Sequence, residues 1–160
     1  MRQRILALAL LSALIHPAAA QEIKPFVSGS IKEISAARQG KPFILGLWSL
    51  TCAHCREELA LLSGMVKKHP DLDLVLVSTD TPEEGEAIGA TLRQSGLGGA
   101  QAWVFADAFA ERLRFEIDPR WHGELPRTYL YDPFHKVQAF SGKPDAAQMA
   151  QWLQKYLSRR

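Results

Sequence analysis

The sequence has very few cysteines: Cys52 and Cys55 are the only two among its 160 residues. A disulfide between residues so close together would constrain almost none of the chain, so a framework of structural disulfides is excluded. There is also no second Cys-x-x-Cys pair and no spaced pair of histidines, so the ligands of a structural zinc site are missing. We therefore interpret the two cysteines as a reactive pair, and we expect no resident metal and no cofactor.

Net charge is also low. The formal net charge is +2, and it falls to zero when residues 1–20 are removed, because this segment contains two arginines and no acidic residue. The sequence has no cluster of lysines and arginines, and no aromatic residues interleaved with basic ones as in nucleic-acid-binding surfaces. We therefore expect no nucleic-acid partner.

The N-terminal segment has the features of a secretory signal peptide. Its apolar run is too short to cross a bilayer comfortably, and no cysteine follows the cleavage position to carry a lipid. An uncleaved membrane anchor is the alternative. We expect a signal peptide at residues 1–20, export to the periplasm, no membrane span after cleavage, and one domain at residues 21–160. The features behind this expectation are Arg2, Arg4, the apolar residues 5–15, the small residues 18–20 and Gln21.

Cys52 and Cys55 stand between a short apolar run at residues 43–47 and a segment with helical periodicity. This order predicts a buried strand, a turn and a helix with both cysteines at its start. Unpaired N–H groups and the peptide dipoles favour negative charge there, which lowers a thiol pKa below about 8.5. One thiolate can then attack a disulfide of another molecule, and the second thiol can resolve the mixed disulfide. The pattern predicts a reversible dithiol whose partners are protein thiols and disulfides.

The remaining pattern alternates between helices and strands, which indicates an α/β fold. The runs at 43–47 and 74–78 lack polar alternation and predict a central parallel pair covered on both faces. We expect an extended or loose arm at 21–29, an irregular stretch at 118–125, and a last helix that covers one sheet face with Trp152 at its edge. The other predicted strands are 102–106, 126–132 and 137–140, and the predicted helices are 30–37, the Cys-x-x-Cys helix up to 69, 82–94, 108–115 and 145–157.

Four further features of the sequence occur together. They are Trp48 four residues before Cys52, the cysteine pair opening a helix, Leu125-Pro126-Arg127-Thr128 starting a strand, and a hairpin that ends at Ser141-Gly142. In these features the chain resembles the thioredoxin superfamily and, within it, the exported TlpA/ResA-type proteins. The resemblance covers nearly all of residues 30–158 and implies a central mixed sheet of about five strands flanked by helices. The segment between Thr79 and Pro119 is similar to the strand–helix insertion of that group.

The resemblance implies a role for each matching residue. Cys52 would be the exposed nucleophile and Cys55 the buried resolving thiol. Pro126 would be a cis-proline facing the disulfide, with the backbone at Leu125 pairing with an extended substrate. Trp48, Leu125 and Pro126 are the substrate-binding residues expected on this basis.

Glu58 falls three residues after Cys55, where ResA-like proteins carry a glutamate that looks placed for thiol proton transfer. A partly buried carboxylate can accept the proton that Cys55 must release. In the alternative interpretation, Glu57 and Glu58 simply complement the positive end of the helix. The sequence also departs from thioredoxins, because Gly46 replaces an acidic residue and Thr51 replaces the common tryptophan before the first cysteine.

His54 is a further departure, because TlpA-like proteins often have proline there, whereas disulfide isomerases and the bacterial periplasmic oxidase have histidine. An imidazole at this position can stabilise the Cys52 thiolate and make the disulfide more oxidising. The resemblance implies a reductase that serves cytochrome c or copper-oxidase assembly and is recharged by a membrane electron donor. An oxidase or isomerase is the first alternative. A copper carrier is the second, because Cys52, His54, Cys55 and His122 could offer thiolates and imidazoles to Cu(I).

Overall fold

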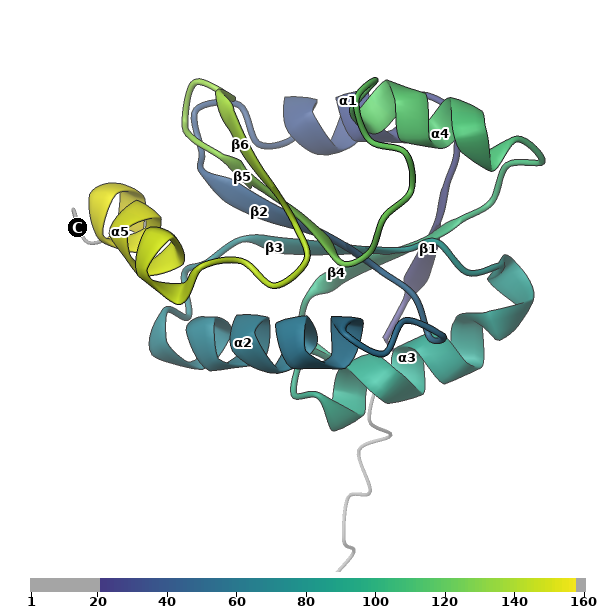
Figure 1. The fold of residues 1–160 in the computed structure, drawn as a ribbon, viewed down its shortest axis with the longest axis horizontal. Coiled ribbons are helices and arrows are strands. Elements are labelled where there is room, and N and C mark those ends of the chain that lie inside the picture. The colour runs from purple at the N-terminus through teal and green to yellow at the C-terminus, as the bar shows by residue number, and fades with distance from the viewer. Residues whose placement is uncertain (1–20, 158–160) are drawn as a thin grey trace, which may run out of the picture.

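The computed structural model describes residues 21–157 as a β-sheet with helices on both faces (Figure 1). The predicted signal peptide and residues 158–160 lie outside the described part. Within residues 21–157 the sheet has six strands in the order β1-β4-β3-β2-β5-β6, and no helix there is long and apolar enough to span a membrane. The elements are β1 (Ile23–Phe26), α1 (Ser30–Ala36), β2 (Phe43–Trp48), α2 (Cys55–Lys68), β3 (Leu74–Ser78), the 3-10 helix η1 (Pro82–Glu84), α3 (Gly85–Gln94), β4 (Gln101–Phe105), α4 (Ala110–Ile117), β5 (Arg127–Tyr131), β6 (Val137–Ser141) and α5 (Ala146–Leu157).

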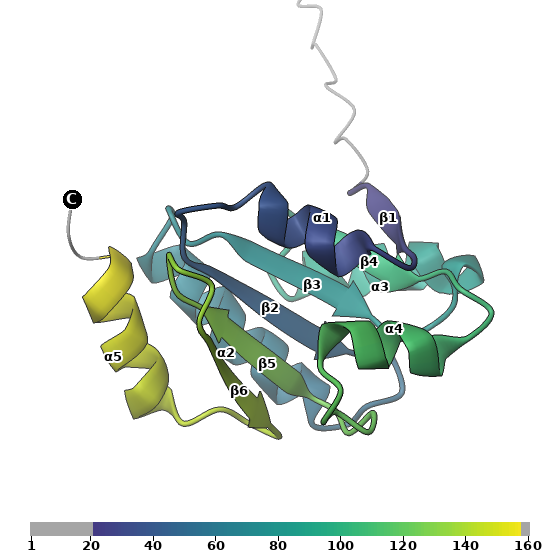
Figure 2. The ribbon, with the colours of Figure 1, turned by 90° about the horizontal axis from the view of Figure 1, so that it is seen from above.

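The sheet is mixed. β2 pairs in parallel with β3, β3 with β4, and β4 with β1, whereas β5 runs antiparallel to both β2 and β6. The parallel pairing of β2 and β3 confirms the prediction from their unbroken apolar runs. Figure 2 shows these two strands in the middle of the sheet.

Two core clusters lie on the two faces of the sheet. Alternate residues of a strand point to opposite faces, and β2 follows this rule: Ile44 and Trp48 belong to one cluster, Leu45 and Leu47 to the other. The first cluster includes side chains of α2, α3 and α5, and the second includes side chains of α1 and α4. β2 is therefore covered on both sides, and its carboxyl end leads directly into the cysteine pair.

The arm expected at residues 21–29 as extended or loose is extended at its centre, where it is a paired strand rather than a free segment. Residues 23–26 form β1, an edge strand parallel to β4, so the sheet has a sixth strand in the described chain. The Phe26 side chain is fully buried, its ring stacking on Phe105 at 5.5 Å and meeting Trp103 edge-on at 6.1 Å. A four-residue strand with a proline has no local signature, because its pairing with β4 and its aromatic contacts are distant in sequence.

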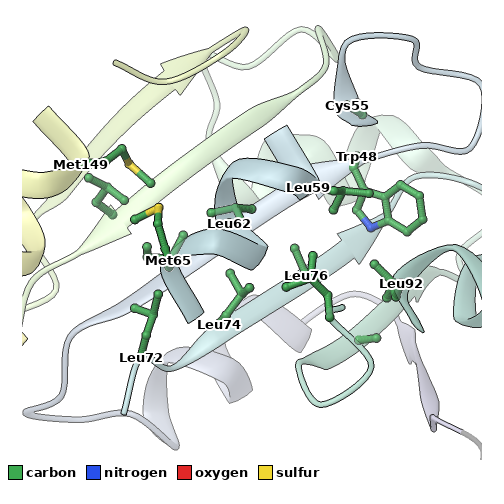
Figure 3. Packing of buried hydrophobic residues seen from close by; sticks show 14 of the residues in the cluster. Trp48, Cys55, Leu59, Leu62, Met65, Leu72, Leu74, Leu76, Leu92 and Met149 are labelled. Atoms are coloured by element: carbon green, nitrogen blue, oxygen red, sulfur yellow. The ribbon is translucent and has the colours of Figure 1, made fainter. Parts of the chain in front are cut away.

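α2 is held against the sheet by its apolar face. Leu59, Leu62 and Met65 are each at most 7 % exposed, and they pack in the cluster shown in Figure 3. Burying one such side chain is worth about 1.5–3 kcal/mol, so the three together hold the helix, and with it the start of the helix, in place. α5 closes the same cluster with Met149, Trp152 and Leu153. Trp152 is 4 % exposed, so the expectation that it lies at an edge is wrong.

The segment between Thr79 and Pro119 contributes η1, α3, β4 and α4. η1 and α3 together occupy the helix predicted at residues 82–94, and α4 begins and ends two residues later than the helix predicted at 108–115. The assignment of this segment as a TlpA-type insertion stays a prediction.

Candidate active site

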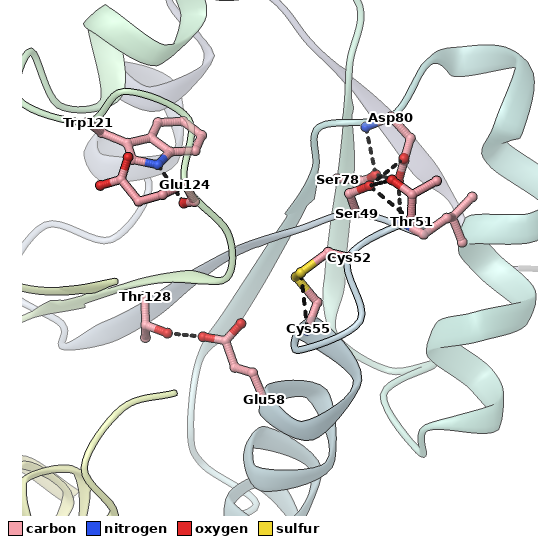
Figure 4. Close-up of a disulfide and its surroundings, with 11 residues drawn as sticks. Ser49, Thr51, Cys52, Cys55, Glu58, Ser78, Asp80, Trp121, Glu124 and Thr128 are labelled. Carbon is pink, nitrogen blue, oxygen red and sulfur yellow. Dashed lines mark hydrogen bonds between the residues drawn. A yellow bond between two sulfur atoms is a disulfide. The ribbon is translucent and has the colours of Figure 1, made fainter. Parts of the chain in front are cut away.

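Cys52 and Cys55 form a disulfide at the start of α2 (Figure 4). Cys55 is the first residue of the helix and is fully buried, whereas Cys52 lies in the preceding turn and is half-buried. The Cys55 N–H donates a hydrogen bond to the Cys52 sulfur at 3.2 Å. This N–H is one of the helix donors that have no partner within the helix. A thiolate at Cys52 would accept the same bond, now charge-assisted and stronger.

His54 is the N-cap residue of α2 and its side chain is exposed. Within residues 21–157 the imidazole makes no capping hydrogen bond to the helix. A role of His54 in stabilising the Cys52 thiolate stays a prediction.

Glu58 lies one turn after Cys55 on the buried side of α2 and is 1 % exposed. Its Oε1 accepts a hydrogen bond from the Thr128 hydroxyl on β5, as Figure 4 shows. Burial raises the pKa of Glu58 to about 7, and the bond from Thr128 opposes this rise only in part. A carboxyl with such a pKa can accept or release a proton near neutral pH.

Glu57 differs from Glu58 although the two are neighbours. Its side chain is 61 % exposed and lies 3.7 Å from the Lys143 ammonium. The interpretation as an acid that complements the helix start therefore suits Glu57. It does not suit Glu58, because that carboxyl is removed from water.

The Leu125–Pro126 peptide bond is cis. Arg127, the next residue, pairs with Leu47 of β2, so Pro126 lies at the carboxyl end of β2, where the chain continues toward Cys52. Pro126 is buried and Leu125 is half-buried. The two residues therefore lie at the same end of the sheet as the disulfide, and their contact with a substrate stays a prediction.

Trp48, the last residue of β2, is 1 % exposed and belongs to the same core cluster as Cys55. A visiting protein therefore cannot touch this side chain without opening the core. The expectation that Trp48 binds substrate directly is corrected to a supporting position beneath the cysteine pair. The physical reason is that the strand side chains alternate, and the one at Trp48 falls on the face covered by α2.

The loop before Pro126 is held by a polar cluster that sequence reasoning missed. Arg127 donates to Asp118 at 2.9 Å and to the Ser141 hydroxyl at 2.6 Å, and Trp121 donates its indole N–H to the Glu124 carbonyl at 2.8 Å. Burial alone would raise the pKa of Asp118, but hydrogen bonds from the Arg120 N–H and from the Arg127 guanidinium outweigh it and lower the pKa. The segment was predicted only as irregular, and no local pattern indicates these contacts.

The histidines do not join the cysteines in a cluster. Among residues 21–157 no group of three His, Cys, Asp or Glu side chains is arranged to hold a metal ion. His122 is exposed, and its N–H donates to Glu124 in the loop before Pro126. His135 is half-buried elsewhere in the described chain, with its ring nitrogen 3.0 Å from the Arg38 carbonyl oxygen. The ligand set considered for a copper carrier is therefore not assembled here.

Comparison with known proteins identifies the fold. A secreted disulfide oxidoreductase of Mycobacterium tuberculosis, described as homologous to E. coli DsbE, matches with a TM-score of 0.57 and 18 % identity over 75 % of this chain and 85 % of its own. A thiol:disulfide interchange protein of Chlorobium tepidum, a thioredoxin family protein, matches with a TM-score of 0.59 and 17 % identity over 77 % and 84 %. This chain has a thioredoxin-like fold.

StoA of Bacillus subtilis is also similar, with a TM-score of 0.51 and 20 % identity over 71 % of this chain and 83 % of StoA. No protein-family model matches the sequence, and a search of curated proteins finds no match. The six-stranded mixed sheet, seen in residues 21–157, and these structural neighbours confirm the thioredoxin-like α/β fold class predicted from the sequence.

Proposed function

We propose that this protein is a periplasmic thiol–disulfide oxidoreductase that exchanges its Cys52–Cys55 disulfide with cysteines of protein partners. The observation that carries the proposal is the asymmetry of the pair: Cys52 is only partly buried, whereas Cys55 is fully buried at the first position of α2. A nucleophile must reach a partner, and a resolving thiol must be kept from it until the mixed disulfide has formed. The fold of the described residues supports the proposal.

In the reductive direction the Cys52 thiolate attacks one sulfur of a partner disulfide. A mixed disulfide forms, and the other partner sulfur leaves as a thiolate. The Cys55 thiolate then attacks the Cys52 sulfur, which restores the Cys52–Cys55 disulfide and releases the second partner thiol. The partner gains two electrons and two protons, and this protein loses them. A dithiol reductant must return them before the next cycle, and the proposed source is a membrane electron donor.

Glu58 is the proposed proton acceptor for Cys55. Its carboxyl lies one helical turn below Cys55 and has a pKa of about 7, so its ionised form is present at neutral pH. Deprotonation of a buried thiol is otherwise unfavourable, because the thiolate loses its hydration. The hydroxyl of Thr128 orients the Glu58 carboxyl from β5.

Leu125 and Pro126 are the proposed edge along which an extended substrate segment lies while the mixed disulfide exists. They stand at the carboxyl end of β2, as the disulfide does. Reduction of protein disulfides during cytochrome c or copper-oxidase assembly is the proposed setting. The support for this finer assignment is the resemblance to TlpA/ResA-type proteins.

Disulfide oxidation or isomerisation is the second candidate. The observation that favours it is the exposed His54 at the N-cap of α2, directly between the two cysteines. A histidine at this place that stabilises the Cys52 thiolate would favour the dithiol and make the disulfide a stronger oxidant.

A trapping experiment tests the proposed exchange. The Cys55→Ala variant keeps the nucleophile but cannot resolve a mixed disulfide, so it should accumulate covalent adducts with partner proteins that disappear on reduction. The matched control, Cys52→Ala, should accumulate few or none, because Cys55 is fully buried. Equal trapping by the two variants, or no adducts with either, would contradict the proposal.

The direction of electron flow has its own measurement. Rapid alkylation of cellular thiols should find the Cys52–Cys55 pair mostly reduced if the protein is a reductase. A mostly oxidised pair would favour the oxidase candidate instead.

A further inference from the structure

Asp80 lies two residues after the end of β3, and its carboxylate reaches the loop that precedes Cys52 (Figure 4). Its Oδ1 accepts a hydrogen bond from the Ser49 hydroxyl at 2.8 Å. Its Oδ2 accepts one from the Leu50 N–H at 2.8 Å and one from the Ser78 hydroxyl at 2.5 Å. One side chain therefore connects the ends of two adjacent parallel strands, β2 and β3.

The contacts continue from Ser49 to the nucleophile. The Ser49 hydroxyl oxygen accepts the Thr51 N–H at 3.2 Å and lies 3.0 Å from the Thr51 hydroxyl. The Ser49 carbonyl accepts the Cys52 N–H at 3.2 Å. Each N–H from Leu50 to Cys52 is thus bonded either to Asp80 or to Ser49, the residue whose hydroxyl donates to Asp80.

Asp80 is not needed as a helix cap, although the sequence around it suggests a helix start. The N-cap residue of η1 is Thr81, which forms a reciprocal capping box with Glu84; the Thr81 N–H donates to Glu84 at 3.0 Å. The bonds that Asp80 accepts come from two hydroxyls and one backbone N–H, and within residues 21–157 it makes no ion pair. The carboxylate is therefore bound to the loop rather than to a helix or a basic side chain.

We propose that Asp80 is a positioning residue that holds the turn at residues 49–52 so that the Cys52 sulfur stays next to the Cys55 N–H when the disulfide is open. The inference rests on the proposed function. In the oxidised protein the covalent bond itself keeps the two sulfurs together. In the reduced protein only the turn and its hydrogen bonds do so. Asp80 thus keeps the Cys52 sulfur beside a hydrogen-bond donor in the dithiol form, and this keeps Cys52 reactive.

The test measures alkylation of Cys52 in the reduced full-length protein across a pH series, with the modified residue identified by mass spectrometry. Asp80→Asn keeps the size of the side chain but removes one acceptor oxygen. The variant holds the turn less firmly, so the Cys52 thiolate loses part of its hydrogen bonding to the Cys55 N–H. The alkylation pKa of Cys52 should therefore rise, and the reaction at pH 7 should be slower by roughly threefold to tenfold.

The direction of the change separates positioning from a simple charge effect. Removing a negative charge near Cys52 would by itself favour the thiolate, lower the alkylation pKa and speed the reaction. A faster or unchanged reaction in Asp80→Asn would therefore overturn the inference.

Two further variants complete the test. Ser49→Ala removes only the hydroxyl that links Asp80 to Thr51, so it should change the alkylation pKa in the same direction by a smaller amount; it carries the test if Asp80→Asn does not fold. Glu84→Gln disturbs the neighbouring capping box without touching the cysteine loop, so it should leave the pKa as in the unmodified protein. A Cys55→Ala protein that traps no mixed disulfides would refute the proposed function, whereas normal trapping together with an unchanged alkylation pKa in the Asp80 and Ser49 variants would refute only the role of Asp80.

Discussion

The ionisation of Glu58 gives this protein an unusual dependence of stability on pH. Below pH 4.5 the carboxyl is protonated in both the unfolded and the native state, so it contributes no pH dependence. Between pH 4.5 and about 7 the unfolded chain releases the proton while the native protein keeps it. The native state binds more protons in this interval, so the free energy of unfolding must fall as the pH rises.

The size of the effect follows from the two pKa values. Each pKa unit between the states corresponds to about 1.4 kcal/mol, so a rise from 4.5 to about 7 destabilises the native protein above pH 7 by about 3 kcal/mol. Because Glu58 is 1 % exposed, little solvent screening reduces this amount. Glu58→Gln replaces the carboxyl by a neutral amide whose oxygen can still accept the bond from Thr128. The variant should therefore lack this loss of stability.

Urea unfolding of the oxidised protein from pH 5 to 8.5 is the measurement, because the closed disulfide keeps the thiols from titrating. The free energy of unfolding of the original protein, relative to Glu58→Gln, should fall by about 3 kcal/mol over this range. Glu57→Gln is the matched control, and its difference from the original protein should stay nearly constant, since Glu57 is exposed. A flat difference for Glu58→Gln would refute the argument that burial raises the Glu58 pKa.

The same variant separates a catalytic role of Glu58 from a merely structural one. If Glu58 accepts the proton of Cys55, the release of a mixed disulfide should accelerate through about pH 7 in the original protein. In Glu58→Gln this step should be slower by roughly a factor of a hundred, without the inflection near neutral pH. Release that keeps its rate and its pH profile in the variant would assign the proton to another acceptor.

Three further substitutions have definite expected outcomes. His54→Pro should lower the reduction potential, by an amount up to the order of 90 mV, as measured in glutathione buffers; an unchanged potential would remove the argument from the imidazole. Asp118→Ala should reduce the free energy of unfolding by about 3 kcal/mol, because it leaves the Arg127 guanidinium, 12 % exposed, without its buried partner; a loss below about 1 kcal/mol would show that the guanidinium finds other partners. Gly46→Ala should lower the free energy of unfolding by about 1–3 kcal/mol in urea titrations, since a Cβ there would lie 3.1 Å from a methyl carbon of Leu76. An unchanged midpoint of urea unfolding would mean that the Leu76 side chain moves aside without cost.

Residue patterns along the chain were sufficient to predict those parts of the fold that depend on residues close together in the sequence. The unbroken apolar runs at residues 43–47 and 74–78 predicted the two central strands, because strands buried on both faces need apolar residues at every position. The spacing of Cys52 and Cys55 before a helical pattern predicted a redox pair at a helix start, because the geometry of one helical turn decides how near two thiols lie. The first residue of α2 is Cys55, however, so Cys52 lies just outside the helix.

Tertiary packing decided the features that depend on residues far apart along the chain. β1 forms because it pairs with the free edge of β4. Phe26 is buried by aromatic side chains that follow it by about eighty residues in the sequence. Trp48 is the last residue of β2 and Trp152 lies in the middle of α5, and only the packing of α2 and α5 shows that both belong to the core. No pattern around these residues contains that information.

The same division applies to the site. The sequence by itself determined which residues could do chemistry: a thiol pair, a histidine between its members and two adjacent glutamates. Only the tertiary structure decided that Glu58 is the buried glutamate, because β5 places Thr128 against it from 70 residues away. It alone placed Asp80 against the turn before Cys52, 30 residues away from Leu50. Reactivity here depends on desolvation and hydrogen-bond partners, and both are supplied by neighbours in space rather than in sequence.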